Sequence, residues 1–307
     1  MYSPAIVDAT DSLTTPSPKL QLRTPQANHR DHAEAYQAGT TDTAKGPCST
    51  VTSSPSTRHF SFSVPYALQL HHCQDCFAES NNLLADILQE GANKTVRTLV
   101  CIDAGVIAEQ PKLAERISNW FSQRHQLKLV EPPLTIAAGE VAKSDWSVVE
   151  QVAEACERGS ICRHSYIVVI GGGAVLDAVG LAASLVHRGV RLIRLPTTTL
   201  AQADAGLGVK NGINAYQNKN FIGNFAPPWA IINDASFLTS LPLRARRDGI
   251  IEAIKVAMIK DVGNYQWLYE KAPAAVHGDD NALQQIIERS ALLQGLTFHI
   301  AHCAFVT

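Results

Sequence analysis

The sequence predicts an α/β fold, with an N-terminal Rossmann-like parallel-sheet domain followed by a C-terminal all-helical domain. Apolar strand-like segments alternate with helical segments between residues 96 and 195, as is typical of a parallel sheet flanked by helices. One of these strands ends in three glycines at residues 171–173, just before a helical segment. After Pro242 the strand-like segments give way to helical ones. These three observations carry the predicted fold class.

The individual elements follow from hydrophobic patterns. Strands are expected at residues 96–103, 165–170 and 190–195, and helices at residues 112–124, 144–157 and 174–186. In the second half, Asp248 is expected to cap a helix that runs to about Lys260. Asp279 or Asp280 is expected to cap another helix that ends near Gly295.

Composition and pattern divide the chain into three parts. Residues 1–58 are rich in Ser, Thr, Pro, Gln and Ala and show no sustained apolar period, so we expect a disordered extension there. Residues 59–240 form the predicted α/β domain, and residues 241–307 the predicted helical domain. A cleft between two such units is a common place for a ligand.

Bulk properties argue against several classes of partner. A net charge of −2 gives no general attraction to nucleic acid or to acidic membranes. The most apolar stretch, residues 165–186, contains Gly171, Gly172, Gly173 and Asp177, so it predicts a buried strand and helix rather than a membrane span. The start of the sequence lacks a secretory signal pattern, and the cysteines are scattered. We therefore expect a cytoplasmic protein with reduced thiols.

The sharpest local motif is IGGGAVLDAVG, residues 170–180, where a strand meets a helix through glycines. Glycine allows a phosphate to approach the backbone, and the helix N-terminus offers free N–H groups and a favourable dipole. The motif lacks the GxGxxG spacing, and a glycine-rich turn can also be purely structural.

Several motifs in one order resemble the 3-dehydroquinate synthase superfamily of sugar-phosphate cyclases. They are residues 171–177, LPTTTLAQADAGLGVKNGIN at 195–214, NKNFIGNFAPP at 218–228 and GIIEAIKVAMIKD at 249–261. The resemblance extends from about Phe60 to about Leu293. It implies an enzyme with NAD and a divalent metal, Zn or Co, bound between an α/β domain and a helical domain.

The resemblance also implies the reaction, the cyclisation of a seven-carbon sugar phosphate with loss of phosphate. NAD+ transiently oxidises a ring hydroxyl, phosphate leaves, the ketone is reduced again, and an intramolecular aldol step closes the ring. The nucleotide ends as it began.

By their positions in the motifs, nine residues are implied to contact NAD+. They are Asp103, Glu140, Lys143, Gly172, Gly173, Asp177, Thr197, Thr198 and Leu241. Asp103 has a simpler interpretation as a polar strand end, whereas in the family pattern an acid there binds ribose.

The resemblance implies a substrate site as well, formed by Asp204, Lys210, Lys219, Asn220 and Lys255. Without it, the first four would be read as a solvated Gly/Asn-rich loop. Hydroxyl groups need paired donors and acceptors and a phosphate needs cations, and this set supplies both.

Two further residues complete the implied set. Arg188 matches an arginine that reaches the active site of a neighbouring subunit, which implies a homodimer, and Glu252 matches a metal ligand. Glu252 and Lys255 could also be a surface i,i+3 ion pair. However, the helix is apolar nearly all round, so we expect it to be buried, with charges that need partners.

The match fails towards the end of the sequence, because the resemblance places the two histidines that complete the family's metal site further along, beyond its last residue. His299 and His302 follow Glu252 too soon, and the HHCQDC segment at residues 71–76 is a weak zinc pattern because it has no second CxxC pair. On this basis the helical domain is expected to be incomplete, as in a truncated or inactive NAD-binding protein.

Other functions stay open. The stretch DAGLGVKNGIN departs from the dehydroquinate synthase pattern and is closer to valiolone-type or eboD-like cyclases, which points to sedoheptulose 7-phosphate as an alternative substrate. An iron-type alcohol dehydrogenase shares the fold, the glycine turn and the PTT loop. The E-x-x-K helix favours the cyclase.

Overall fold

The structure is a computed structural model that describes residues 58, 60 and 66–304, with side chains up to residue 295. From Tyr66 onward, the described residues belong to one compact unit, residues 62–307. The predicted extension, residues 1–58, lies almost wholly outside the described residues.

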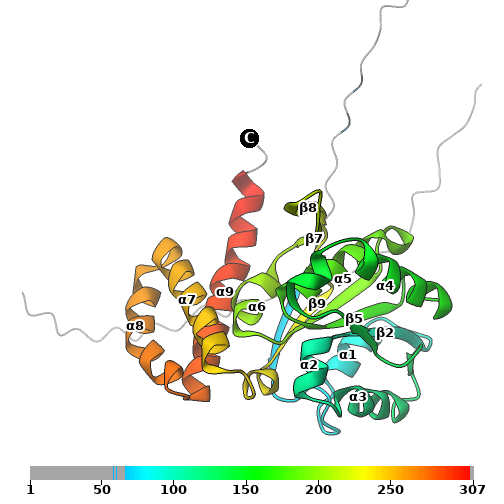
Figure 1. Ribbon diagram of the computed structural model, residues 1–307, viewed down its shortest axis with the longest axis horizontal. Coiled ribbons are helices and arrows are strands. Elements are labelled where there is room, and N and C mark those ends of the chain that lie inside the picture. Colours follow the sequence, from blue (N-terminus) through cyan, green and yellow to red (C-terminus); the bar gives the residue numbers. More distant parts are fainter. Residues whose placement is uncertain (1–57, 59, 61–65, 305–307) are drawn as a thin grey trace, which may run out of the picture. The chain divides into compact units, whose positions relative to one another are not determined.

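The centre of this unit is a parallel sheet of seven strands (Figure 1). Six of them run in the order β1-β9-β6-β5-β2-β3, and β4 (Leu134–Ile136) pairs with the end of β2. Their bounds are β1 Gln69–Cys73, β2 Val96–Asp103, β3 Leu127–Leu129, β5 Tyr166–Gly171, β6 Arg191–Pro196 and β9 Ala230–Asp234. Every pairing is parallel, so the carboxyl ends of the strands lie at one edge of the sheet.

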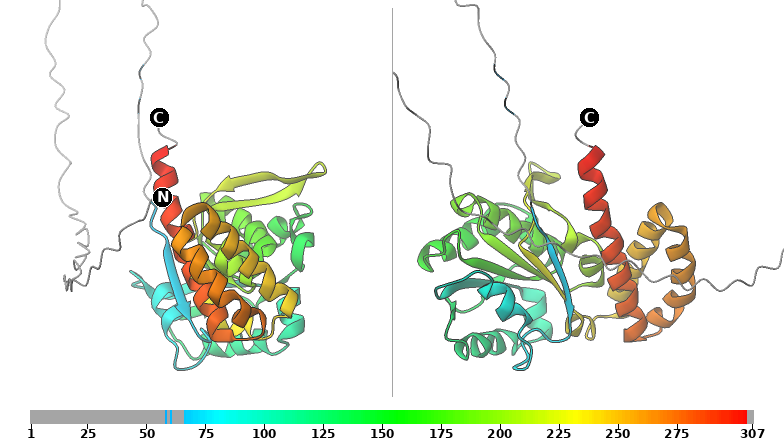
Figure 2. Two further views of the ribbon diagram at one scale, coloured as in Figure 1. Left: turned by 90° about the vertical axis from the view of Figure 1, so that its left-hand side faces the viewer. Right: turned by 180° about the vertical axis from the view of Figure 1, so that it is seen from behind.

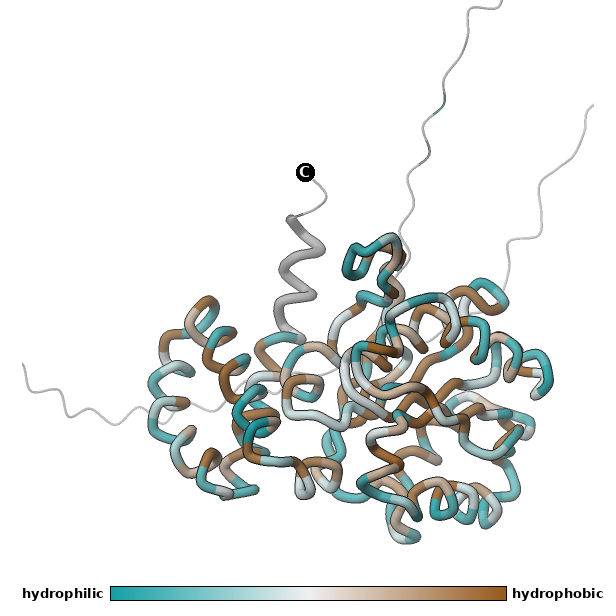
Figure 3. The backbone as a smooth tube through the Cα atoms, viewed as in Figure 1, coloured by the Kyte–Doolittle hydropathy of each residue, from teal (hydrophilic) through white to brown (hydrophobic). Residues whose placement is uncertain are grey.

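Side-chain alternation along β5 explains the layers on either side. Ile167 and Val169 pack in one core with α4 (Ser147–Arg158) and α5 (Gly173–Leu185). Val168 and Ile170 pack in a second core with α1 (Leu83–Gln89) and α3 (Leu113–Ser122). Burial on both faces accounts for the unbroken apolar run of this strand, coloured as hydrophobic in Figure 3.

Short elements connect the sheet to the rest of the unit. They are α2 (Ala104–Glu109), η1 (Gly139–Lys143), η2 (Val186–Arg188), α6 (Thr199–Ala203), η3 (Ala205–Leu207) and η4 (Ala235–Leu238). A separate antiparallel hairpin joins β7 (Lys210–Ala215) and β8 (Asn218–Phe225). Its two turn residues, Tyr216 and Gln217, have φ of 50° and 65°, as in a type I′ turn.

Three helices follow the last strand. They are α7 (Leu243–Lys260), α8 (Val262–Val276) and α9 (Asp280–Ala304), and their apolar side chains form a third core. Ala291 of α9 also packs with Leu207 and Ile231, and Leu70 of β1 packs against that cluster. Figure 2 shows α9 passing beside β1. The predicted α/β sheet followed by helices is therefore confirmed.

Two predicted helix boundaries are wrong. Helix α7 begins at Leu243, and Asp248 lies inside it. Pro242 is the N-cap of this helix, with φ of −64°, a value that proline fixes, and an extended ψ of 153°, so the helical backbone starts at the next residue. Asp279 does cap α9, because its Oδ1 accepts hydrogen bonds of 3.0 Å from the backbone N–H groups of Asn281 and Ala282, but this helix continues past Gly295 to Ala304.

The expectation that the Glu252–Lys255 helix is buried is met on one face only. Ile250 and Ala253 of α7 are buried in the third core, whereas Ile251 is 63% exposed and Ile259 is 73% exposed. The buried residues of α7 recur every three or four positions, as on one face of a helix, and α6, α8 and α9 are among the elements that contact it. An apolar pattern therefore does not by itself show that a partner covers every face.

The most apolar stretch of the sequence, residues 165–186, lies in the α/β part of the structure. Residues 165–186 fold as strand β5 and helix α5, as predicted. Within the described part of the chain, no helix combines the length and the apolar character needed to cross a bilayer.

The two-sided burial of β5 gives a stability test. Ile170 is fully buried, so Ile170→Ala should lower the free energy of unfolding by about 2–5 kcal/mol through lost burial and a residual cavity. The same substitution at the exposed Ile251 should change it by less than about 0.5 kcal/mol. Urea denaturation of both variants measures the difference, and equal losses would contradict the burial described here.

Candidate cofactor and substrate site

Predicted cofactor residues lie where the central strands end. In the sheet register, Ile102 is opposite Ile170, and Gly171 is opposite Pro196. The residues that follow, Asp103 on β2, Gly172 after β5 and Thr197 after β6, therefore lie along one edge. In open α/β sheets, ligands bind outside the carboxyl ends of the strands.

The glycine turn combines close packing with open space. A Cβ on Gly171 would lie 3.0 Å from the Asp103 Cβ and 3.1 Å from the Val175 side chain, so a larger residue would displace its neighbours. A Cβ on Gly172 would make only ordinary contact, 3.5 Å from Thr198 Cγ2. No side chain caps the N-terminus of α5. The first N–H groups of this helix can therefore receive an anionic group.

Asp103 is a buried carboxylate at this edge. It is 7% exposed, and its Oδ1 accepts a 2.7 Å hydrogen bond from the Gly105 N–H, which caps α2. Asp103 can serve both as a polar strand end and as a ribose-binding acid. One oxygen fixes the local backbone, and the carboxylate can accept further hydrogen bonds.

Lys143 and Asp177 form an ion pair beside the glycine turn. The Lys143 Nζ lies 2.7 Å from the Asp177 Oδ2, and the two side chains are 7% and 26% exposed. A buried ammonium needs such a partner. Glu140, in the same short helix η1, is exposed. The structure thus brings together Lys143 and Asp177, and leaves Glu140 at the surface nearby.

The PTT loop follows β6 on the other side of the turn. The Thr197 N–H donates to the Gly171 carbonyl at 3.0 Å, and Thr198 Oγ1 accepts from the Ala201 N–H at 3.1 Å as the cap of α6. Thr198 also lies nearest to Gly172. Leu241 is half-buried and packs with the helical core of α7–α9.

Asp204 and Glu252 are two carboxyl groups that face each other. Burial raises the pKa of Asp204, and the charge and hydrogen bond of Glu252 raise it further. Lys255 forms an ion pair with Glu252, whose hydrogen bond raises the pKa of the Lys255 ammonium. The i,i+3 pair considered from the sequence therefore exists, with the Lys255 side chain 59% exposed and that of Glu252 13% exposed.

Helix α9 adds an amide to this cluster, which sequence reasoning did not include. The Gln294 Nε2 donates to the Asp204 Oδ1 at 2.5 Å, and the Lys260 Nζ donates to the Gln294 Oε1 at 2.5 Å. The cluster therefore joins α6, α7 and α9, and two lysines neighbour the two carboxyl groups.

The remaining predicted substrate residues lie on the hairpin. Lys210, Lys219 and Asn220 are all exposed. Lys219 and residues 214–218, around the hairpin turn, line a hollow of about 250 Å³ together with Ser144, which directly follows Lys143. The Asn220 backbone has φ of 52°, and its N–H donates to the Asn214 Oδ1 at 2.8 Å.

Arg188 does not join this group of residues. It is exposed and follows the C-terminal end of α5, whereas Gly172 and Gly173 lie at the N-terminal end. A helix of 13 residues separates the two by roughly 20 Å.

The described residues supply only part of a metal site. Two facing carboxylates are suitable oxygen donors for a divalent cation, which would relieve their repulsion. In the described part of the chain, however, no group of three or more His, Cys, Asp or Glu side chains is placed to hold a metal ion. In the HHCQDC segment, Cys76 is buried, and its N–H donates to the Asp234 carboxylate at 2.7 Å.

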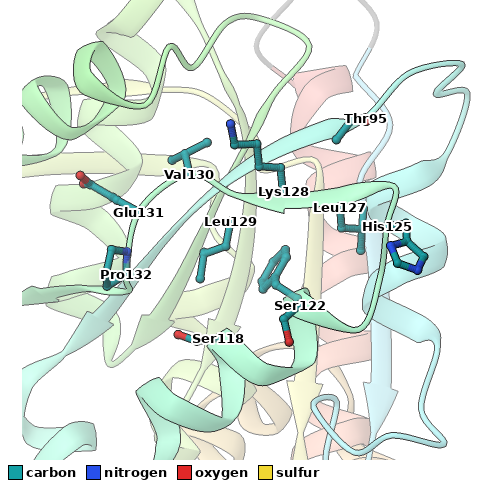
Figure 4. A pocket seen from close by; sticks show the side chains of 11 residues that line it. Thr95, Ser118, Ser122, His125, Leu127, Lys128, Leu129, Val130, Glu131 and Pro132 are labelled. Carbon is teal, nitrogen blue, oxygen red and sulfur yellow. The ribbon is translucent and has the colours of Figure 1, made fainter.

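A larger hollow, about 660 Å³, lies elsewhere, along β3 and α3 (Figure 4). The strand β3 pairs with the start of β2, residues 96–98, and so lies away from Asp103 at its end. None of the predicted site residues lines this hollow. Its size therefore does not make it the candidate site.

Sequence reasoning missed three buried polar residues near the site. Arg194, Gln202 and Asn211 are 0%, 2% and 5% exposed. The Gln202 Nε2 donates to the carbonyls of Pro196 at 3.0 Å and Asp234 at 2.9 Å, which ties α6 to the ends of β6 and β9. The available signal was a charged residue, Arg194, inside the otherwise apolar run LIRL.

Comparison with known proteins gives a consistent result. Residues 133–248 match the family model described as 3-dehydroquinate synthase N-terminal. The chain is 39% identical over 158 residues to a 2-epi-5-epi-valiolone synthase of Streptomyces glaucescens, covering 52% of this chain and 40% of that protein. It is 40% identical over 198 residues to a 3-dehydroquinate synthase of Sulfolobus acidocaldarius, covering 62% of this chain and 56% of that protein.

A solved structure is also similar. It is ValA, a 2-epi-5-epi-valiolone synthase from Streptomyces hygroscopicus subsp. jinggangensis 5008, with NAD+ and Zn2+ bound. The TM-score is 0.66 at 28% identity, and the match covers 76% of this chain and 62% of that one. The chain spans about half the length of the curated relatives it matches.

The Asp204–Glu252 arrangement predicts a pH effect on stability. Because the pKa of Asp204 is raised above its usual 3.8, the folded chain holds its proton to higher pH than the unfolded chain does. This contribution therefore lowers the free energy of unfolding as the pH rises above that value. Asp204→Asn should remove the decline and be more stable than the wild type at neutral pH.

Urea denaturation in EDTA, from about pH 4 to about pH 8, measures this effect. Asp86→Asn, at an exposed position on α1, is the control and should leave the pH dependence unchanged. A parallel wild-type and Asp204→Asn profile would contradict the proximity of the two carboxyl groups.

Proposed function

Because the resemblance to sugar-phosphate cyclases of the 3-dehydroquinate synthase superfamily is confirmed over more than half of the chain, we propose that the protein is an NAD-dependent, metal-dependent cyclase. In this proposal its substrate is a seven-carbon sugar phosphate, and the reaction eliminates phosphate. The observation that carries the proposal is the uncapped N-terminus of α5, which shares one edge of the sheet with Asp103 and the Lys143–Asp177 pair.

The proposed NAD site uses the groups at that edge. The first N–H groups of α5, at Gly172 and Gly173, would receive the pyrophosphate, and Asp103 would accept hydrogen bonds from ribose hydroxyls. Lys143, Asp177, Thr197 and Thr198 would surround the nicotinamide end, with Glu140 and Leu241 at the margins. When bound, NAD+ supplies a hydride acceptor that is regenerated within one turnover.

The proposed substrate site uses the lysines and the carboxyl cluster. Lys210, Lys219 and Asn220 are exposed on the hairpin, and exposed lysines can approach a phosphate without losing an existing partner. Asp204 and Lys255 would bind sugar hydroxyls. Because the pKa of Asp204 is raised, its carboxylate takes up a proton more readily than usual, as a general base requires.

The proposed metal, Zn or Co, would bind at Glu252. Its facing carboxyl, Asp204, gives the cation a second nearby negative group, and further ligands would come from outside the described set. A divalent cation there would polarise a substrate oxygen.

Two alternatives differ in class. A catalytically inactive protein would bind NAD+ without turnover, an alternative favoured by the incomplete set of described metal ligands. An iron-type alcohol dehydrogenase would use the same sheet edge to oxidise an alcohol with net formation of NADH. Within the cyclases, the choice between a seven-carbon keto-acid phosphate and sedoheptulose 7-phosphate is left to experiment. A cytoplasmic location stays a prediction.

A turnover assay tests the proposal. With NAD+ and Zn2+ or Co2+ present, we expect phosphate release from one of the two seven-carbon substrates without net NADH formation. Lys255→Met should reduce the rate by at least about 100-fold, while leaving NAD+ affinity unchanged, because a substrate-side proton or charge partner is lost. NADH accumulation with simple alcohols would indicate the dehydrogenase, and NAD+ binding without any turnover would indicate the inactive protein.

The ribose role of Asp103 predicts a loss of cofactor affinity. Asp103→Asn should weaken NAD+ binding about tenfold to a hundredfold, since a hydrogen bond to a charged group contributes about 1.5–3 kcal/mol. Isothermal titration calorimetry measures the dissociation constant. Asp86→Asn, on the exposed side of α1, should bind NAD+ like the wild type. Unchanged affinity in Asp103→Asn would leave this residue as a structural cap of α2 only.

We also propose a homodimer that covers the exposed aromatic side chains of the β7–β8 hairpin. Tyr216 and Phe225 are 82% and 74% exposed on this hairpin, and a two-stranded hairpin is only marginally stable alone. The hairpin contacts α5, because the Asn224 Nδ2 donates to the Ser184 Oγ at 2.7 Å. Ser184 lies four residues before Arg188. Arg188 therefore lies on a segment next to the surface that a second copy would cover.

Sedimentation velocity tests the dimer. The wild type should sediment as a dimer, and Tyr216→Ser should weaken dimerisation by at least about tenfold, because exposed aromatic side chains commonly anchor interfaces. Tyr269→Ser, also at an exposed tyrosine, but on α8, is the matched control and should have no effect. A wild type that stays monomeric at every concentration would reject the dimer.

A further inference from the structure

The most unusual buried residue outside the predicted site is Arg194. It lies in β6 with 0% exposure, in the middle of the sheet, between Val169 of β5 and Ile231 of β9 in the strand register. Burying a cation is costly unless hydrogen bonds replace its water. The partners of this guanidinium therefore indicate what the burial achieves.

Arg194 donates four hydrogen bonds, and three of them go to one short loop. Its Nη1 donates to the carbonyls of Gly206 at 3.1 Å and Gly208 at 2.6 Å. Its Nη2 donates to the carbonyl of Lys210 at 3.3 Å and to the Asn211 Oδ1 at 2.7 Å. A planar guanidinium has five N–H donors in a fixed fork, so one side chain can hold several carbonyls in a defined geometry.

The loop that Arg194 holds carries two predicted substrate residues. It runs from Asp204, at the end of α6, to Lys210, at the start of β7. The three bound carbonyls belong to alternate residues, so the backbone curves around the guanidinium between these two side chains. Any movement of the loop would change where Asp204 and Lys210 lie relative to the sheet edge.

A second layer of contacts fixes the guanidinium itself. The Asn211 Nδ2 donates to the Ala226 carbonyl at 3.0 Å, which connects the loop to the far end of the hairpin. A Cβ on Gly180 would lie 1.9 Å from the Asn211 Oδ1 and 3.3 Å from the Arg194 Nη2. Because Gly180 has no side chain, Asn211 and Arg194 can lie against helix α5 at this position.

The charge of Arg194 is also connected to the cofactor side. Burial lowers the pKa of the guanidinium to about 10, and the nearby Asp177 carboxylate opposes this shift. Arg194 therefore stays cationic at neutral pH. Asp177 is the same residue that pairs with Lys143 beside the glycine turn.

We propose that Arg194 is a positioning residue that fixes the 204–211 loop, and thereby places Asp204 and Lys210 for the substrate. The substrate part of this inference rests on the proposed cyclase function. The loop-holding part does not, because it follows from the four hydrogen bonds and from the space at Gly180.

Hydrogen–deuterium exchange of the full chain tests the loop-holding part. Arg194→Gln keeps a polar side chain but loses most donors, and exchange in peptides covering residues 204–211 should accelerate by at least about tenfold. Arg194→Lys keeps the charge and should partly restore protection. Arg191→Gln changes another arginine of β6, one that donates to the Tyr166 hydroxyl, and should leave the loop unchanged.

Gly180→Ala supplies an independent variant without touching Arg194. Its new Cβ should displace Asn211 and accelerate exchange in the same peptides, so the test survives even if Arg194→Gln does not fold. Unchanged exchange in 204–211, or equal acceleration in the β2 and β5 peptides, would overturn the inference.

Kinetics separates positioning from general support. In Arg194→Gln, the KM for the sugar phosphate should rise, or kcat fall, by at least about tenfold, while the NAD+ dissociation constant stays within about twofold. A parallel loss of NAD+ affinity would make Arg194 a merely structural residue and overturn its positioning role. If the wild type turns over neither sugar phosphate, the proposed function fails, whereas the exchange comparison still decides whether Arg194 holds the loop.

Discussion

The parallel pairing of β5 with β2 and β6 is the constraint on which the rest of this structure depends. Because all three strands run in one direction, their carboxyl ends coincide, and residues far apart in sequence are delivered to one edge. Asp103, the glycine turn and the PTT loop owe their proximity to this register alone. Helices cover β5 on both faces of the sheet, so the site lies at the end of a fully buried strand.

Sequence patterns predicted the three central strands, β2, β5 and β6, well because burial on two faces leaves a strong signal. The runs at 96–103 and 165–170 each contain a continuous apolar stretch, LVCI at 99–102 and YIVVI at 166–170, and they correspond to β2 and β5 within one residue. Helix α8 and the β7–β8 hairpin were not predicted, because neither has a clear apolar period. The start of α7 was misplaced because an internal aspartate resembled a cap, although the preceding proline was the stronger signal.

The candidate site was predictable only in part, for a similar reason. Motif order pointed to Lys143 and Asp177, and their contact requires only that η1 lie beside α5. The contact of Gln294 with Asp204 could not be foreseen, because 90 residues separate them and no local pattern marks the pair. The polar network around Arg194 was overlooked because strand prediction counts apolar residues and passes over a single buried charge.

The lack of a side chain at Gly180 also has a consequence for related proteins. Position 180 lies on a helix, position 194 on a strand and position 211 on a hairpin, yet their atoms occupy one small volume. A related protein with alanine or a larger residue at the first position cannot keep the same asparagine–arginine arrangement at the other two. These three positions should therefore change together during divergence, and relatives that have exchanged the set must hold the equivalent loop by other means.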